Sequence, residues 1–149
     1  MEETRLMLTF IAPNGEHTLM FEDDGKVAYA YLKEENATIV GDVWLYNRCP
    51  TPPEPEWSDR SKIPFANSRA YTSEEGRVER DVQARDVLVD WENEDGNPVA
   101  YVYLFEDLCG VVGVGDKPGY ARFATKSGRL ARVMEIEEST PSPNATDAA

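Results

Sequence analysis

The sequence has little of the side-chain chemistry that most metal sites and nucleophilic enzymes require. Its 149 residues include a single histidine, His17, and two cysteines, Cys49 and Cys109. Zinc sites take three or four nitrogen or sulfur ligands, and a histidine-dependent nucleophile needs an imidazole oriented by a third group. No such pattern surrounds His17, which begins an apolar run. We therefore predict no metal site, no catalytic residue and no cofactor, and we place His17 at the edge of a strand.

Long apolar runs and basic leader patterns are also missing. No stretch reaches the length of about 20 apolar residues that a membrane helix needs. The first four residues include two glutamates where a secretory signal would carry a basic patch. Two cysteines are too few for a disulfide framework. We expect a cytoplasmic protein that does not enter a membrane and that keeps both thiols free and buried.

Basic residues are scarce relative to acidic ones. The chain has 15 Lys and Arg against 28 Asp and Glu, which gives a formal net charge of −13. This charge repels phosphate backbones, so we expect no nucleic acid as a partner. Solubility alone would explain it, as would attraction to a basic partner protein or mimicry of the charge of DNA. Within residues 48–85, seven basic residues balance seven acidic ones, so the excess lies elsewhere.

Two similar segments organise the chain. Each places an Asp-Gly corner between two apolar runs, at Asp24-Gly25 and at Asp95-Gly96, and each return run reads Val-Ala-Tyr-x-Tyr-Leu. Glycine accepts a positive φ and aspartate tolerates one, so Asp-Gly between such runs predicts a β-hairpin. The similarity fits either an internal duplication or convergence on a good hairpin sequence.

Other segments are also typical of strands. Residues 5–11, 16–22, 38–47, 109–115 and 120–124 are rich in strand formers and bounded by turns. Residues 128–136 form a last strand or a terminal helix. Val78 and Val82 at helical spacing, after a Ser73 that could cap, indicate a short helix over residues 74–85. The glycines of 110–115 have the wrong spacing for a phosphate-binding loop and indicate a bent strand.

Together these patterns predict a mainly β fold. We expect a single domain over residues 1–136, built as an antiparallel β-sandwich or a strongly twisted sheet of seven to nine strands, with at most one or two short helices. Residues 137–149 have the composition of a disordered acidic tail.

A proline-rich stretch interrupts the strand pattern. Residues 48–75 contain five of the ten prolines, and proline neither donates to a sheet ladder nor continues a helix. Loops of this length are usually functional or mobile. Trp57, Phe65 and Tyr71 make it more aromatic than a disordered linker, so we predict that the loop folds back on the sheet.

Aromatic residues on the predicted strands are the best candidates for a binding surface. Tyrosines and tryptophans on one sheet face form either a core or a recognition platform, and a loop over that face would create a concave site. The acidic corners 22–24 and 92–95 are exposed turns, or an acidic rim if they lie side by side. Our candidate binding residues are Trp57, Phe65, Tyr71, Tyr29, Tyr31, Trp44, Tyr46, Tyr101 and Tyr103.

Several short words along the chain resemble a known family. The words are Phe-Glu-Asp-Asp-Gly at 21–25, Tyr-x-Tyr at 29–31, Leu-Tyr-Asn at 45–47 and Val-Asp-Trp at 89–91, with Asp95-Gly96 following. They are similar to a family of small bacterial proteins that carries only a domain-of-unknown-function label, over roughly residues 18–123. The resemblance implies a compact bacterial β-rich domain and no catalytic residue. The proline-rich insert and the acidic tail depart from that pattern.

These observations lead to two functional hypotheses. The first is a non-catalytic protein-binding module of the immunity or inhibitor type, in which an acidic body steers toward a basic partner and the aromatic loop and strand face make the contact. The alternative is a domain, with or without weak enzymatic activity, that binds a small molecule or carbohydrate on the Tyr/Trp strand face. A catalytic carboxylate pair would depend on a separation in space that no local motif reveals.

Overall fold

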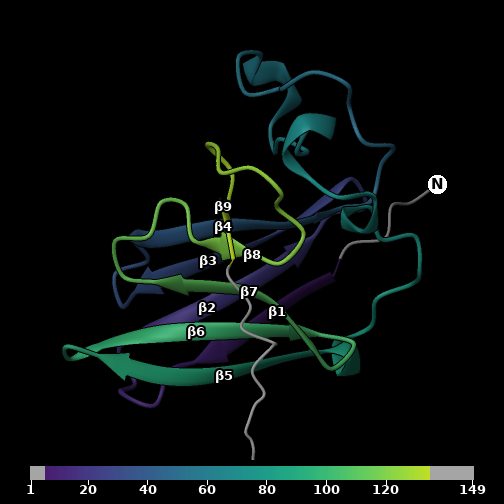
Figure 1. Ribbon diagram of the computed structural model, residues 1–149. Coiled ribbons are helices and arrows are strands. Elements are labelled where there is room, and N and C mark those ends of the chain that lie inside the picture. Colours follow the sequence, from purple (N-terminus) through teal and green to yellow (C-terminus); the bar gives the residue numbers. More distant parts are fainter. Residues whose placement is uncertain (1–5, 135–149) are drawn as a thin grey trace, which may run out of the picture.

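Nine strands form two sheets in the computed structural model, which describes residues 6–134 (Figure 1). The first sheet is antiparallel, with strand order β1 (Leu6–Ile11), β2 (His17–Asp23), β3 (Val27–Glu34) and β4 (Ile39–Asn47). The second runs in the order β5 (Val87–Glu94), β6 (Asn97–Leu104), β7 (Asp107–Gly113), β8 (Tyr120–Ala121) and β9 (Arg132–Val133). Only β8 and β9 pair in parallel. The predicted mainly β fold is confirmed.

Both predicted hairpins form. β2 and β3 join at Asp24-Gly25, and β5 and β6 join at Asp95-Gly96. Gly25 and Gly96 have φ values of 92° and 85°, a backbone conformation that glycine adopts without a steric penalty. Asp24 Oδ1 accepts hydrogen bonds from the N–H groups of Lys26 and Val27 at 2.8 and 3.0 Å. The aspartate therefore stabilises the turn that the sequence predicts.

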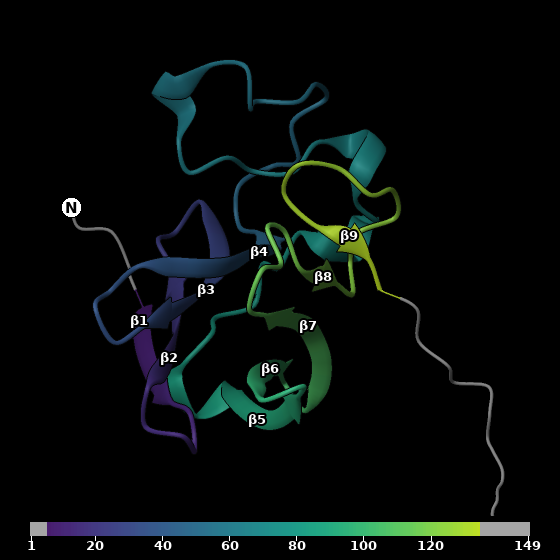
Figure 2. The same ribbon diagram turned by 90° about the vertical axis from the view of Figure 1, so that its left-hand side faces the viewer.

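The hydrophobic core lies between the two sheets. Figure 2 shows β1–β3 on one side and β5–β7 on the other. Alternate residues of β2 and of β6 are buried, and side chains from both sheets form a single hydrophobic cluster. Phe21, Leu32 and Val102 are fully buried in it, and each such side chain stabilises the fold by about 1.5–3 kcal/mol. Period-two alternation thus directs one face of each sheet inward.

The edge of β4 that faces away from β3 forms backbone hydrogen bonds with residues 115–130. The N–H of Asp42 donates to Asp116 O at 2.9 Å, and the N–H of Trp44 donates to Leu130 O at 2.9 Å. A Cβ on Gly41 would lie 2.6 Å from Gly113 O, so glycine permits the close approach of the two sheets here. The glycine-rich strand therefore packs closely against β4. Glycines within a strand commonly mark either a bend, as predicted here, or such a close approach.

The proline-rich loop contains no strand. It contains two three-residue 3₁₀ turns, η1 (Arg60–Lys62) and η2 (Arg69–Tyr71), an isolated β-bridge from Thr72 to Ala124, and the start of a third turn at Glu74. In both ribbon views the loop projects from the end of the first sheet at which β4 ends (Figures 1 and 2). It contacts β3 through the Tyr29 hydroxyl, which donates to Phe65 O at 2.7 Å. The predicted return of the loop to the sheet is confirmed.

The predicted helix over residues 74–85 is wrong. Two separate 3₁₀ turns, η3 (Glu74–Gly76) and η4 (Ala84–Asp86), occupy its ends. Between them the N–H of Val78 donates to Asn47 O at 2.8 Å, and Arg77 forms a β-bridge with Asn47. Val78 and Val82 are buried, but pairing of the backbone with the end of β4, and not a helix, holds this segment in place.

Smaller differences concern the C-terminal strands and the thiols. β8 and β9 have two residues each, so the strand at 120–124 is shorter than predicted, and 128–134 contains a strand rather than a helix. Both cysteines are free, but Cys49 is half-buried whereas Cys109 is buried. The predicted tail lies outside the described residues. No helix in residues 6–134 has the length and apolarity to cross a membrane.

Candidate functional site

The nine candidate aromatic residues do not share a surface. Tyr29 faces Trp44 across β3 and β4, on the side of the first sheet that the loop covers. Tyr46 pairs instead with Ala28 and packs inward, 6.4 Å from the Phe21 ring. Tyr101 and Tyr103 belong to the second sheet, and the loop aromatics form a further group. These aromatic side chains are therefore divided among four places rather than gathered on one sheet face as either a core or a platform.

The loop-covered face is a closed contact rather than an open cleft. The Tyr29 and Tyr31 rings stack with centroids 5.8 Å apart and an interplanar angle of 8°. Tyr29 is 9 % exposed because the loop backbone at Phe65 occupies the space beside its hydroxyl. Burial, with the neighbouring Glu22 carboxylate adding to it, raises the pKa of Tyr31 to about 12. Both tyrosines are therefore neutral members of the packing under the loop.

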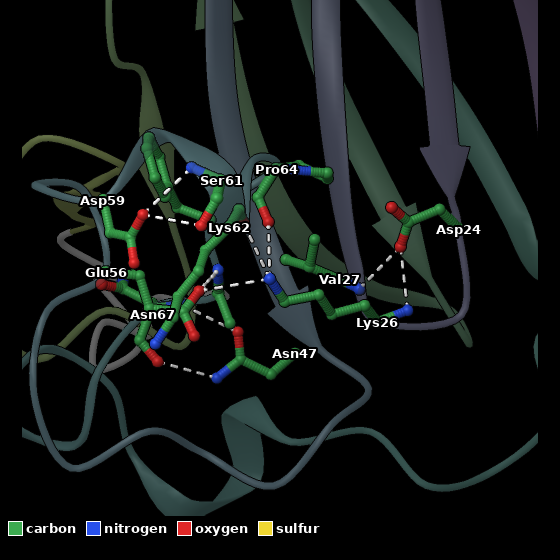
Figure 3. A network of polar contacts seen from close by, with 12 residues as sticks. Asp24, Lys26, Val27, Asn47, Glu56, Asp59, Ser61, Lys62, Pro64 and Asn67 are labelled. Atoms are coloured by element: carbon green, nitrogen blue, oxygen red, sulfur yellow. Dashed lines mark hydrogen bonds and ion pairs between the residues drawn. The ribbon is translucent and has the colours of Figure 1, made fainter.

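Polar contacts hold the loop to the end of the first sheet, as Figure 3 shows. The Lys26 ammonium donates to the carbonyl oxygens of Lys62 and Pro64 at 2.8 and 3.1 Å and forms an ion pair with Glu56 at 3.3 Å. Glu56 also accepts from the N–H of Ala66 at 3.0 Å. These partners are spread along the loop, so one lysine at the hairpin corner fixes several of its turns.

The loop aromatics pack internally. Trp57 and Tyr71 meet edge to face with centroids 5.1 Å apart, and the Lys126 ammonium lies 5.1 Å from the Tyr71 ring centroid. Trp57 and Phe65 pack against the hydrophobic core. Aromatic pairs and cation–π contacts of this kind each contribute about 0.5–1.5 kcal/mol. Trp57, Phe65 and Tyr71 therefore serve to order the loop.

Tyr46 belongs to a buried polar contact at the same end of the first sheet. Its hydroxyl donates to Asp23 Oδ2 at 2.8 Å, and Arg48 Nε lies 3.6 Å from that oxygen. Burial, then the Asp23 carboxylate, raises the pKa of Tyr46. Trp44 donates from its indole nitrogen to Asn47 Oδ1 at 2.9 Å. Trp44 and Tyr46 are both fully buried, so neither can contact a ligand at the surface.

Within the described part of the chain, the outer face of the second sheet forms a broad aromatic surface that solvent reaches. We name it the tyrosine face. The strand register places Leu88 beside Tyr103, Tyr103 beside Leu108, Tyr101 beside Val111, and Val111 beside Tyr120. Leu88 is 60 % exposed, and the others are partly exposed. The tyrosine face comprises Leu88, Tyr101, Tyr103, Leu108, Val111 and Tyr120.

Carboxylates border this face. Asp90 lies opposite Tyr101 in the register of β5 and β6, and Glu92 lies opposite Val99. The pKa of Tyr101 is raised, first by partial burial and then by the negative charges of Glu92 and Glu94. On the other side, the Arg132 guanidinium stacks over the Tyr120 ring at 4.3 Å. The face is thus apolar and aromatic with an acidic border along β5.

A groove crosses the tyrosine face toward the last described residue. Its volume is about 530 Å³. The residues that line it are apolar or tyrosine: Tyr101, Leu108, Val111, Tyr120, Val133 and Met134. Such a lining offers ring faces and two hydroxyl groups to a ligand, so it is suited to binding rather than to proton transfer.

His17 and Cys109 occupy different places in the fold, the first in an exposed turn and the second in the core. His17 begins β2 as predicted, and its Nδ1 lies 3.0 Å from Asn14 Nδ2 in an exposed turn. Burial raises the pKa of the Cys109 thiol to about 12, so this thiol is inert at neutral pH. Among residues 6–134, no three His, Cys, Asp or Glu side chains are grouped as metal ligands would be.

Comparison of the chain with protein-family models, with curated proteins and with solved structures found no match. The resemblance to a family of small bacterial proteins therefore stays a prediction.

Sequence reasoning identified two of the six residues of the tyrosine face. Leu88, Leu108, Val111 and Tyr120 were not among the predicted binding residues. The signal for Leu88 was available, because the alternation of 87–92 places it outward with Asp90 and Glu92 while Val87, Val89 and Trp91 turn inward. An exposed leucine among the acidic residues on one face of a strand indicates a contact surface. The other three required the register of β7 and β8.

Proposed function

We propose that this protein is a non-catalytic protein-binding module and that the tyrosine face is its contact surface. The observation that carries the proposal is that the exposed Leu88 of β5 lies opposite Tyr103 of β6, with Asp90 opposite Tyr101 on the same face. Tyrosine and large apolar side chains at the centre of an interface contribute most of its binding energy. An acidic border provides the long-range attraction to a basic partner.

The charge of the whole chain supports a basic protein as the partner. At a net charge of −13, the protein accelerates the approach of a cationic surface and slows that of an acidic one. This combination suits an inhibitor or immunity protein that covers a basic target. The proline-rich loop is not part of this contact surface. Within the loop, Trp57 packs against Tyr71, and Trp57 and Phe65 also pack against the hydrophobic core.

Site-directed photocrosslinking tests this proposal. A benzophenone amino acid replaces Tyr103 in the tyrosine face, or Ile39, an exposed residue at the start of β4, as a matched control. Each variant is irradiated in native lysate at low and high salt. We expect one basic protein to crosslink at position 103 and not at 39, with a yield that falls by tenfold or more at high salt.

The same partner is then purified and titrated with the wild-type chain, with L88K and with Y101A/Y103A. Loss of a central aromatic pair is expected to weaken binding by at least tenfold. A captured protein that binds all three chains equally, or whose binding is indifferent to salt, contradicts the proposal.

The groove favours a second candidate function. Its two tyrosines and apolar lining suit a small apolar molecule or the ring face of a sugar. Titration calorimetry against a panel of oligosaccharides and aromatic acids tests it, with V111W, which fills the groove, as the negative control. Binding that V111W abolishes would favour this alternative over a protein partner.

A further inference from the structure

The first sheet ends in an edge strand that has no charged residue. β1 is the outermost strand, and within the described residues it pairs only with β2. The opposite edge of that sheet, β4, is completed by the backbone of residues 115–130. An edge strand presents unpaired N–H and C=O groups that can receive a further strand.

The residues of β1 do not protect this edge. The strand reads Leu-Met-Leu-Thr-Phe-Ile and has neither a charge nor a proline. Met7 is 51 % exposed and Ile11 is 69 % exposed. Natural edge strands are usually blunted by charges, proline or bulges. The edge strand of the second sheet, β5, follows this rule with Asp90, Glu92 and Glu94.

We propose that β1 is the site at which two copies of this chain associate, by antiparallel pairing of one β1 with the other about a two-fold axis at Thr9. In this register Met7 lies opposite Ile11 of the second copy on the outer face, and Leu8 lies opposite Phe10 on the inner face. Thr9 meets its own counterpart. Every cross-strand pair is then apolar or Thr–Thr, and such pairs stabilise a sheet. Two four-stranded sheets become one continuous sheet.

Charge selects a second copy as the occupant. Copies that each carry −13 repel one another, so self-association is favoured through a strand that has no carboxylate of its own, and β1 is such a strand. Pairing through β5 would set its three carboxylates against like charges. A basic partner finds no carboxylate on β1, whereas Asp90, Glu92 and Glu94 of β5 border the tyrosine face. A two-fold pair is also self-complementary by construction.

Sedimentation velocity of the full chain tests this association. A single pair of edge strands makes a small interface, so we expect a weak dimer whose fraction rises through micromolar to millimolar concentration. T9K and T9E each place like charges opposite each other at the axis and should lower the association constant about tenfold. Because Thr9 is exposed, both variants should fold. Mixing T9K with T9E pairs opposite charges and should restore the dimer.

Salt and a matched variant separate this association from the proposed function. High salt screens the repulsion between acidic copies and should strengthen the dimer, whereas it weakens binding to a basic partner. L88K alters the tyrosine face and should leave the dimer unchanged. A wild-type chain that stays monomeric at millimolar concentration, a T9K chain that dimerises like wild type, or a T9K and T9E mixture that stays monomeric overturns the proposal.

Discussion

Asn47 at the end of β4 and Asn67 in the proline-rich loop exchange two hydrogen bonds. The N–H of Asn67 donates to Asn47 Oδ1 at 2.9 Å, and Asn47 Nδ2 donates to Asn67 O at 2.9 Å. Figure 3 shows the pair beside the Lys26 contacts. Both residues are buried, so the asparagine side chain replaces a strand partner for the loop backbone at this point.

Substitution of Asn47 should therefore release the loop. N47A removes both of these bonds and the one from Trp44 Nε1, which leaves buried donors and acceptors without partners. We expect a loss of about 2–5 kcal/mol in the free energy of unfolding, measured by urea denaturation. The matched control is N36A, because the exposed Asn36 also accepts a backbone hydrogen bond. Equal losses for N47A and N36A would contradict this role.

Gly119 should not tolerate a side chain. A Cβ at this position would overlap Val111 O and lie 3.2 Å from Val112 Cα, and a strand backbone cannot move aside as a flexible side chain can. We expect G119A to lower the free energy of unfolding by about 1–3 kcal/mol or more. The control is G15N, because Gly15 has a φ of 72° and a Cβ added there would meet no atom within 4 Å, and asparagine tolerates that conformation. A neutral G119A would contradict the close approach.

Asp42 should destabilise the fold at neutral pH. Burial raises the pKa of its carboxyl in the folded chain, and Lys117 opposes this only in part. At pH values between the pKa of Asp42 in the unfolded chain and its higher pKa in the folded chain, the folded state binds more protons than the unfolded state. The free energy of unfolding therefore falls as pH rises through this range. D42N removes the ionisable group. We expect D42N to unfold at higher urea than wild type at pH 7 and to lose this advantage at pH 3. An advantage that grows on acidification would contradict the sign.

The two thiols should react with Ellman's reagent at very different rates. Cys109 is buried with a pKa of about 12. Burial also raises the pKa of Cys49, but this thiol is only half-buried and is open to the reagent. The thiolate is the reactive form, so at pH 8 the folded wild-type chain should release about one equivalent of thionitrobenzoate quickly and the second only on unfolding. C49S should remove the fast phase. Two equal fast phases would show that Cys109 is accessible.

Local chemistry explains what the sequence predicted well. Asp24-Gly25 and Asp95-Gly96 specify their hairpins by backbone preference alone, and prolines between 50 and 64 exclude strands and α-helices whatever lies nearby. The helix predicted at 74–85 failed because Val78 obtains its backbone hydrogen bond from Asn47, 31 positions earlier. No pattern in the sequence around Val78 predicts a hydrogen-bond partner this far along the chain.

The division of the aromatic residues has a similar cause. Trp44 and Tyr46 are two residues apart, so regular alternation places them on one face. A register shift in the pairing of β3 with β4 sets Trp44 opposite Tyr29 but Tyr46 opposite Ala28, so Leu45 is an extra residue and the two rings face opposite sides. A β-bulge depends on both strands and is not visible in either one.

The contribution of Asp116 and Leu130 to the edge of β4 has a consequence for synthesis. The first four strands leave the ribosome some 70 to 85 residues before the segment that completes their last edge. Until that segment emerges, the nascent chain presents β4 with open backbone groups, as does any protein truncated ahead of Leu130. Such a fragment should depend on a chaperone that covers exposed strands, and a stop codon ahead of the segment 115–130 should yield an aggregating product rather than a slightly shorter protein.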